Sequence, residues 1–237
     1  ATNARVSPMK QLLFQTTPTP APALLIFCNG WAMTRAAIDH LSLPLGYDLL
    51  LVEDYRSQDF SFDFSPYAHV DLVAWSMGVW AATLLHQYGK LPHLSRAIAI
   101  AGTPYPRHDD WGIPCAIFDA TRDNLNEENR ERFNRRMCGG KRLRHLFDSL
   151  KTRSTEELKT ELSCVGLQPP FPIEQGQSPW THAIIPVKDR IIPSCNQLAW
   201  WRNTKVGIAT LPQADHYPFG AYSHWEELLS PDTLPHE

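Results

Sequence analysis

The sequence predicts an α/β fold with a mostly parallel, doubly wound β-sheet, and two observations carry this prediction. Short, continuously apolar runs recur along the chain, and helical patterns fall between them. Runs that are continuous rather than alternating are typical of parallel strands covered on both faces. Strand, helix and strand in repetition build one layered α/β sheet. Ligands bind such sheets in the loops that follow the carboxyl ends of the strands.

The apolar runs predict seven strands. They are expected over residues 23–28, 47–52, 69–75, 95–101, 113–118, 181–186 and 205–210. The tract 16–22 holds three prolines and is expected to be a turn between two short strands. Helices are expected over residues 77–88, directly after the third run, and over 197–202, between the last two runs.

The stretch from about residue 122 to 166 contains no strand pattern and is predicted to be helical. We expect it to be a lid-like insertion in one domain over 9–237. Residues 1–8 are expected to be a leader that is disordered or left from expression. Residues 130–153 hold nine lysines and arginines against two acidic residues, a local charge of +7. Because the whole chain carries −3, the remainder carries −10.

The overall composition argues against several classes of protein. The 237 residues are 43% hydrophobic and 20% charged, and a net charge of −3 gives no general reason to bind nucleic acid. No apolar run has the length of a membrane helix, and residues 1–10 lack the apolar core of a signal peptide. The five cysteines are scattered without a C-x-x-C pair, which favours a reducing, cytoplasmic location over a disulfide framework or a zinc site.

Ser76 is the candidate nucleophile. It stands between a buried strand that ends at Trp75 and a predicted helix, with the small residues Ala74 and Gly78 two positions away on either side. Such a strand–serine–helix elbow, usually written G-x-S-x-G, is typical of the α/β-hydrolase fold. It raises the hydroxyl above the sheet and aims the N–H of Met77 at the space over it. The alternative is a serine that merely caps the helix.

A second oxyanion donor is expected from the loop after the first long strand, Asn29–Ala32. In α/β-hydrolases this loop is often H-G-x, and here Asn29 replaces the histidine. Because the donor is a backbone group, we assign the role to the N–H of Trp31, together with that of Met77. The alternative is a plain turn between a strand and a helix.

Asp189 and His216 are the candidate acid and base. Each follows a predicted late strand, and the chain order Ser, Asp, His is that of the α/β-hydrolase fold. A serine hydroxyl needs a base, and the base needs a carboxylate that fixes its tautomer. Asp123 is the alternative acid. The histidines that could compete with His216 are His108, His182 and His224.

Five segments in order resemble one family. They are N-G-W-A-M, E-D-Y-R, V-A-W-S-M-G-V-W-A-A, W-G-I-P-C-A-I-F and D-H-Y-P-F, spread between about residues 9 and 225. In them the chain resembles the BioG-type pimeloyl-[acyl-carrier protein] methyl ester esterases. The resemblance implies an α/β-hydrolase fold with a helical lid. It also implies a carboxylic ester hydrolase of biotin biosynthesis that releases methanol from pimeloyl-[acyl-carrier protein] methyl ester.

The resemblance makes acyl carrier protein the expected partner, and no metal or organic cofactor is expected. Acyl carrier proteins are acidic, so the basic helical segment is a suitable docking surface. The candidate docking residues are Arg132, Arg135, Arg136, Lys141, Arg142 and Arg144. A charged face that only contacts solvent is the alternative. Two other functions stay open: an esterase or thioesterase for small or CoA-bound acyl groups, and a non-catalytic scaffold that binds an acyl ligand or the carrier protein.

Overall fold

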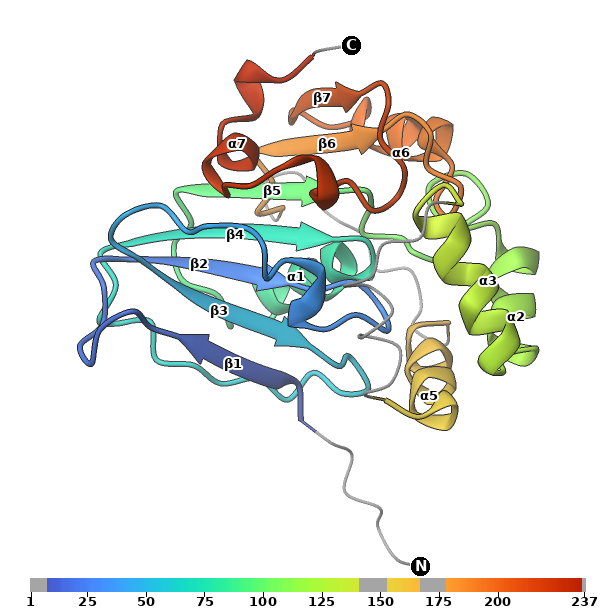
Figure 1. The fold of residues 1–237 in the computed structure, drawn as a ribbon, viewed down its shortest axis with the longest axis horizontal. Helices are drawn as coiled ribbons and strands as arrows, with labels where there is room; N and C mark the ends of the chain where they lie inside the picture. Colours follow the sequence, from blue (N-terminus) through green and yellow to red (C-terminus); the bar gives the residue numbers. More distant parts are fainter. Residues whose placement is uncertain (1–7, 141–152, 167–177, 236–237) are drawn as a thin grey trace, which may run out of the picture.

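The computed structural model describes residues 8–140, 153–166 and 178–235. Seven strands form one sheet in the order β1-β3-β2-β4-β5-β6-β7 (Figure 1). β1 pairs with β3 in antiparallel fashion at one edge, and all other pairs are parallel. The strands are β1 (Lys10–Phe14), β2 (Ala23–Cys28), β3 (Tyr47–Glu53), β4 (His69–Trp75), β5 (Arg96–Ile100), β6 (His182–Pro186) and β7 (Gly207–Leu211).

Six of the seven predicted strands are confirmed, with ends that differ by at most two residues. The continuous apolar runs predict these strands well because the central strands are covered on both faces. Every residue of β2 is buried, as are all but the first residue of β3 and of β4. The proline-rich tract 16–22 joins β1 to β2, which confirms the predicted turn between two strands.

The helices on the sheet include α1 (Met77–Gln87), which starts one residue after β4 and packs on β4 and β2. α6 (Ser194–Trp201) joins β6 to β7, and α7 (Glu226–Leu229) follows the last strand. Single turns of 3₁₀-helix, η1 (Arg35–Ala37), η2 (Phe219–Ala221) and η3 (Pro231–Thr233), complete the connections. Among the described helices, none has the length and apolar character needed to cross a membrane.

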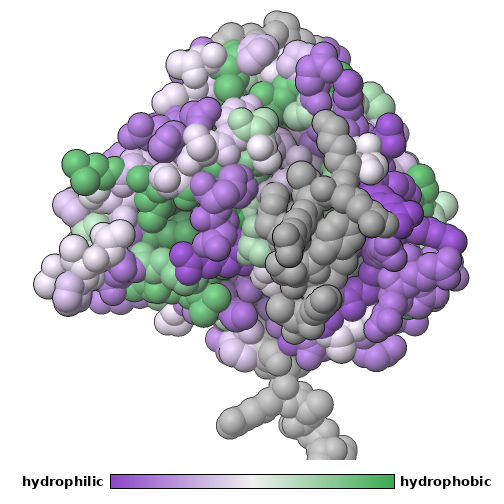
Figure 2. All heavy atoms as spheres, viewed as in Figure 1, coloured by the Kyte–Doolittle hydropathy of each residue, from purple (hydrophilic) through white to green (hydrophobic). Residues whose placement is uncertain are grey.

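Three further helices gather beyond the carboxyl ends of the parallel strands, and we call them the cap (Figure 1). They are α2 (Cys115–Asp123), α3 (Glu127–Met137) and α5 (Thr155–Gly166). All three lie in the chain between β5 and β6, and α2 packs on α5. Hydrophilic side chains dominate the surface on the side of the molecule where α2 and α3 lie (Figure 2).

The predicted strand over residues 113–118 is wrong, because α2 begins at Cys115 after Pro114. A short apolar run does not by itself distinguish a strand from a helix. The run continues into a polar segment, and of the α2 residues only Phe118 is buried, as in a surface helix. The sheet also has no place for this strand, because β5 pairs directly with β6.

Candidate active site

Ser76 lies in a sharp turn between β4 and α1. Its φ of 56° and ψ of −123° lie in a region that residues with a side chain rarely adopt. Such a conformation costs about 1–3 kcal/mol and persists only where the surroundings enforce it. The Ser76 side chain makes no capping hydrogen bond to α1. The geometry therefore matches a nucleophile elbow and not the alternative of a capping serine.

Small residues around Ser76 allow the elbow to form. A Cβ on Gly78 would lie 2.1 Å from the carbonyl oxygen of Cys28. Glycine at this position therefore lets α1 approach β2 more closely than a residue with a side chain would allow. A Cβ on Gly102 would lie 2.5 Å from the Ser76 carbonyl oxygen. Ala74 is fully buried, with Cys28 and Ala99 as its partners in the sheet register. The importance of Gly102 was not predicted, since it follows a different strand.

One chain of hydrogen bonds joins Ser76, His216 and Asp189. The Ser76 Oγ lies 2.8 Å from Nε2 of His216, and Nδ1 of the same ring lies 2.7 Å from Oδ2 of Asp189. His216 and Asp189 are both buried. A carboxylate on Nδ1 favours the tautomer in which Nε2 is free to accept the serine proton. The structure thus brings together the three residues that the sequence predicted, although they lie 27 to 140 positions apart.

Asp189 is held by four donors, and Gln197 was not predicted to be one of them. Oδ1 accepts the N–H groups of Ile191 at 2.8 Å and Ile192 at 2.9 Å. Oδ2 accepts Nε2 of Gln197 at 2.9 Å, besides the ring of His216. Gln197 is completely buried on α6, and its amide also donates to the carbonyl of Ile192. A buried polar side chain on this helix has no sequence signature that links it to Asp189.

The loop that carries His216 is fixed from three directions. The indole of Trp75 donates to the His216 carbonyl at 2.9 Å. The N–H of Tyr217 donates to the carbonyl of Met137 at 3.0 Å, which ties this loop to the end of α3. The Tyr217 hydroxyl donates to the Ala37 carbonyl at 2.6 Å. Trp75 is fully buried and belongs to the core, so it does not form a wall of the cavity described below.

The alternative acid and bases lie in other surroundings. Asp123 ends α2 and forms an exposed ion pair with Arg122 at 2.9 Å. His108 stacks on Trp111 with ring centroids 4.3 Å apart. His182 lies at the start of β6, and His224 lies in the bridge to Ser42 beside α7. The imidazole that contacts Ser76 is that of His216, and the carboxylate that contacts this imidazole is that of Asp189.

Residues 29–32 follow β2 and lie beside the elbow, and we call them the oxyanion loop after the role that the sequence predicts for Trp31. Trp31 and Met77 line the same cavity as Ser76. Met77 is the first residue of α1. At this end of a helix the backbone N–H groups have no partner inside the helix, and the positive end of the helix dipole lies here. Ala32 has a φ of 68°, so the loop is strained like the elbow. The arrangement can place two backbone donors near an oxygen atom bound over Ser76.

The cavity over Ser76 has a volume of about 110 Å³ and a mainly apolar wall. Cap residues such as Ile117, Phe118 and Phe133 form one side of it, and Ile192 and Pro193 form another. Trp31 also lines the cavity, and its ring contacts that of Phe133 edge-on, with centroids 5.1 Å apart. Among the described residues, Arg136 and Arg190 are the arginines that line the cavity. This shape suits a substrate with an apolar acyl chain.

Three of the six predicted docking residues lie on α3, and the other three, Lys141, Arg142 and Arg144, lie outside the described residues. Arg132 and Arg135 are exposed and paired with the glutamates four residues before them at 2.7 and 2.8 Å. Exposed pairs of this kind contribute little to stability and exchange easily with other partners. Arg136 is also exposed, and it lines the cavity over Ser76.

Comparison with known proteins decides the family. The sequence profile of "Pimeloyl-ACP methyl esterase BioG" matches residues 15–228, nearly the whole chain. The protein belongs to the BioG family. The predicted resemblance is thereby confirmed, and this BioG-family chain is an esterase or hydrolase of the α/β-hydrolase fold.

The chain is similar to several individual proteins. The crystal structure of BioG from Haemophilus influenzae superposes with a TM-score of 0.81 at 32% identity, over 94% of this chain and 100% of the other. An uncharacterized protein from that organism is 34% identical over 209 residues, which are 86% of this chain and 93% of the relative. A malonyl-[acyl-carrier protein] O-methyltransferase from Bacteroides fragilis is 43% identical over 184 residues, or 75% of this chain. The match covers only 36% of that longer protein.

More distant structures share the fold alone. An esterase from Exiguobacterium antarcticum superposes with a TM-score of 0.65 at 12% identity, over 88% of this chain and 89% of that one. The predicted mostly parallel sheet of an α/β-hydrolase is therefore confirmed both by the strand order and by these neighbours.

Proposed function

We propose that this BioG-family protein is a serine esterase that hydrolyses the methyl ester of pimeloyl-[acyl-carrier protein], giving pimeloyl-[acyl-carrier protein] and methanol. The reaction would free the terminal carboxylate of the acyl chain during biotin biosynthesis. The observation that carries the chemistry is the hydrogen-bonded series Ser76, His216 and Asp189 beneath an apolar cavity. The family match supports the choice of substrate.

In the proposed mechanism the Ser76 oxygen attacks the ester carbonyl carbon while Nε2 of His216 takes the serine proton. Asp189 holds the imidazolium that results, and its four donors keep the carboxylate in place. The carbonyl oxygen becomes an oxyanion and accepts the N–H groups of Trp31 and Met77. When the tetrahedral intermediate collapses, the methoxide leaves with the proton from His216 as methanol. Water then attacks the acyl-enzyme by the same route and regenerates Ser76.

The cavity supports an acyl substrate attached to a larger carrier. Its apolar wall suits the methylene chain, and it passes between the cap and the sheet. Arg136 and Arg190 add positive charge to the wall. The exposed arginines of α3 lie on the same helix as Arg136, so an acidic carrier bound there would bring its acyl arm close to the cavity. The thioester to the carrier is expected to remain intact.

Methanol release from methyl-pimeloyl-[acyl-carrier protein] tests the proposal. The wild-type protein should release methanol rapidly, and Ser76→Ala should lower turnover by about 10⁶-fold, as loss of such a nucleophile does. Ser65→Ala, in an exposed loop, is the matched control and should behave as the wild type. No release by the wild type, with small esters still cleaved through Ser76, would leave an esterase with a different substrate. Release that persists in Ser76→Ala would contradict the proposed mechanism.

A further inference from the structure

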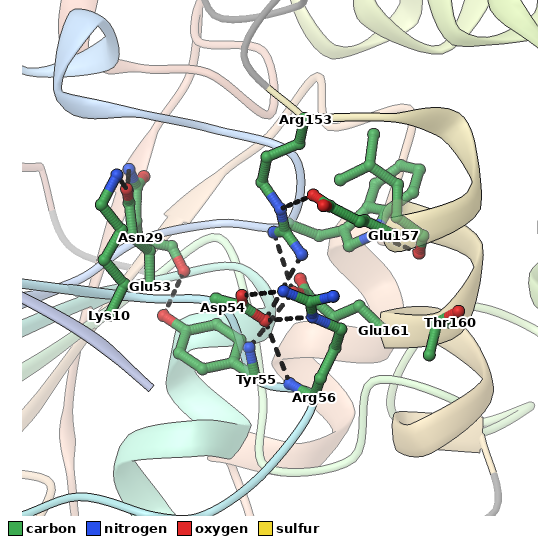
Figure 3. A network of polar contacts seen from close by, with 12 residues as sticks. Lys10, Asn29, Glu53, Asp54, Tyr55, Arg56, Arg153, Glu157, Thr160 and Glu161 are labelled. Atoms are coloured by element: carbon green, nitrogen blue, oxygen red, sulfur yellow. Dashed lines mark hydrogen bonds and ion pairs between the residues drawn. The ribbon is translucent and has the colours of Figure 1, made fainter. Parts of the chain in front are cut away.

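The oxyanion loop is held by groups outside itself. The carbonyl of Asn29 accepts the hydroxyl of Tyr55 at 2.5 Å, and the Asn29 amide donates to Glu53 at 3.2 Å (Figure 3). Tyr55 lies in the loop after β3 and is buried, so this hydrogen bond is shielded from water. Because Ala32 has a φ of 68°, the loop needs such contacts to keep its conformation.

The cap helix α5 contacts the same region at two buried points. The carbonyl of Leu158 accepts the indole N–H of Trp31 at 3.0 Å. One turn further, Oε2 of Glu161 accepts the backbone N–H of Tyr55 at 3.1 Å (Figure 3). Helix α5 therefore contacts Trp31 directly and Asn29 indirectly. The indirect contact runs through Tyr55, whose backbone N–H donates to Glu161 and whose hydroxyl donates to Asn29.

Glu161 is the charged residue on which this face of α5 depends. Its side chain is only 1% exposed, and its carboxylate accepts a hydrogen bond from Nη1 of Arg153 at 2.9 Å. Arg153 also lies 3.4 Å from Asp54, the residue before Tyr55. A buried carboxylate is costly unless it is paired and hydrogen-bonded. Here the arginine pairs the charge, and the Tyr55 N–H uses the carboxylate to fix the loop after β3.

Residues with a strained backbone conformation lie in the loops that these contacts hold and in the neighbouring loops. Among the described residues, four that are not glycine have a positive φ: Ala32, Asp54, Ser76 and Ala101. They lie in the loops after β2, β3, β4 and β5, respectively, at the edge of the sheet where the cavity opens. Glu161 and Arg153 contact the second of these loops, and through Tyr55 they act on the first.

We propose that Glu161 is a positioning residue that acts through Tyr55 to hold the oxyanion loop in the conformation that presents the N–H of Trp31 to the substrate. The inference rests on the proposed function, because it gives Trp31 the role of oxyanion donor. The cap is then part of the framework of the catalytic centre besides being a cover for it. Loss of the Glu161 contact lets the loop relax and weakens stabilisation of the transition state, whereas the apolar wall that binds the acyl chain stays in place.

The expected effect falls on kcat and not on KM. Complete loss of one oxyanion donor lowers turnover by about 10²–10³-fold. Glu161→Ala only loosens the loop, so kcat should fall roughly 10-fold while KM changes by less than about 2-fold. Glu161→Gln keeps an oxygen that can accept the Tyr55 N–H, and it should recover most of the lost turnover. Tyr55→Phe removes the hydroxyl that bonds to the Asn29 carbonyl and also lies 3.2 Å from the Val52 carbonyl, and it should lower kcat in the same manner.

Glu157→Ala is the matched control. Glu157 lies one turn earlier on α5 and pairs with the same Arg153 at 3.7 Å, but it does not contact Tyr55. Turnover of a small p-nitrophenyl ester is measured for each variant, so that carrier binding does not enter. The rate at which a fluorophosphonate labels Ser76 and the affinity of a trifluoromethyl ketone, which forms an oxyanion on the serine, report the donor geometry. Melting temperatures show whether each variant is folded during the assay.

The proposal expects Glu161→Ala and Tyr55→Phe to lower kcat, labelling rate and ketone affinity together, with less than additive losses in the double variant. It is overturned if Glu161→Ala lowers only the melting temperature, or if it matches Glu157→Ala in turnover. If Glu161→Ala does not fold, Tyr55→Phe decides by the same criteria. A wild-type protein that neither cleaves the ester nor reacts with the fluorophosphonate would instead refute the proposed function, and this inference with it.

Discussion

Ser76 has a strained backbone conformation that depends on small residues around it. The positions two residues before and after it are small, and Gly78 touches the carbonyl of Cys28 where no Cβ would fit. The small residues themselves are readable in the sequence because they stand two positions from Ser76, although the carbonyl that Gly78 meets is 50 positions away. Gly102, which contacts the Ser76 carbonyl from the neighbouring strand, is invisible to the same reasoning, because it is 26 positions away.

Gln197 is the residue whose contribution to the site is easiest to isolate. Its amide donates both to Asp189 and to the Ile192 carbonyl in a buried position. Gln197→Leu keeps the volume but removes one of the donors that orient the carboxylate. We expect kcat for a small ester to fall by roughly 10-fold, since a charge-assisted buried hydrogen bond contributes about 1.5–3 kcal/mol.

The measurement for Gln197→Leu is steady-state turnover, with Gln213→Leu as the control. Gln213 is exposed and bonds to Lys188, so its loss should leave turnover unchanged. Unchanged turnover in Gln197→Leu would show that the two loop N–H groups of Ile191 and Ile192 are sufficient to hold Asp189.

The cap helix α2 was not predicted correctly from the sequence pattern. The run at 113–118 has the composition of a buried strand, yet it contributes to a helix whose Ile117 is 50% exposed. Exposure of that side chain is understandable only in the folded protein, where it lines the cavity over Ser76. An apolar residue kept for a ligand has the same sequence signature as one kept for the core.

The helix α3 carries the predicted docking residues that the structure describes. Arg132→Glu with Arg135→Glu reverses two exposed charges while leaving the buried face of the helix intact. If an acidic carrier binds here, kcat/KM for methyl-pimeloyl-[acyl-carrier protein] should fall by at least about 10-fold, with little change for a small methyl ester. Raising the salt concentration should reduce the difference between the variant and the wild type.

The control for α3 is the reversal of Lys90 and Lys205, which are exposed and lie outside the cap. This variant makes the same change in net charge. Equal losses of kcat/KM in both variants would indicate a general charge effect. Equal losses on the protein-bound ester and on the small ester would contradict the docking hypothesis.

The helix α5 is expected to make stability depend on pH. Burial raises the pKa of Glu161 from its ordinary 4.5 to about 7, and Arg153 only partly opposes this. The folded protein therefore binds this proton more tightly than the unfolded chain does. The contribution of Glu161 to stability is largest below about pH 4.5 and is lost as the pH rises towards 7.

Glu161→Gln removes this titration without removing the side chain. We expect its free energy of unfolding, relative to the wild type, to be higher at pH 8 than at pH 5, as measured by urea denaturation. Asp54, Tyr55 and Arg153 face the same carboxylate and are present in both proteins. Glu156→Gln, in an exposed position on α5, is the control and should show an equal difference at both pH values. A constant difference for Glu161→Gln would contradict the raised pKa.

The molecule as a whole assembles its site from segments at both ends of the chain. Loops after β2, β4, β6 and β7 contribute Trp31, Ser76, Asp189 and His216, and the parallel sheet brings these loops to one edge. The cap closes over that edge and also bonds to the site, since Leu158 contacts Trp31 and Met137 contacts the His216 loop. The cap and the candidate site are therefore expected to respond together to changes in either.

What the sequence by itself determined follows from short-range physics. Continuous apolar runs specify parallel strands, small residues on both sides of Ser76 specify the elbow, and the order Ser76, Asp189, His216 matches the fold. Only the tertiary structure decided that α2 is a helix, that Gln197 supports Asp189, and that Glu161 reaches Tyr55. These last features depend on contacts between residues 8 and 106 positions apart, and on burial. Pattern and propensity act over a few residues and carry no information about which distant group a buried polar side chain will meet.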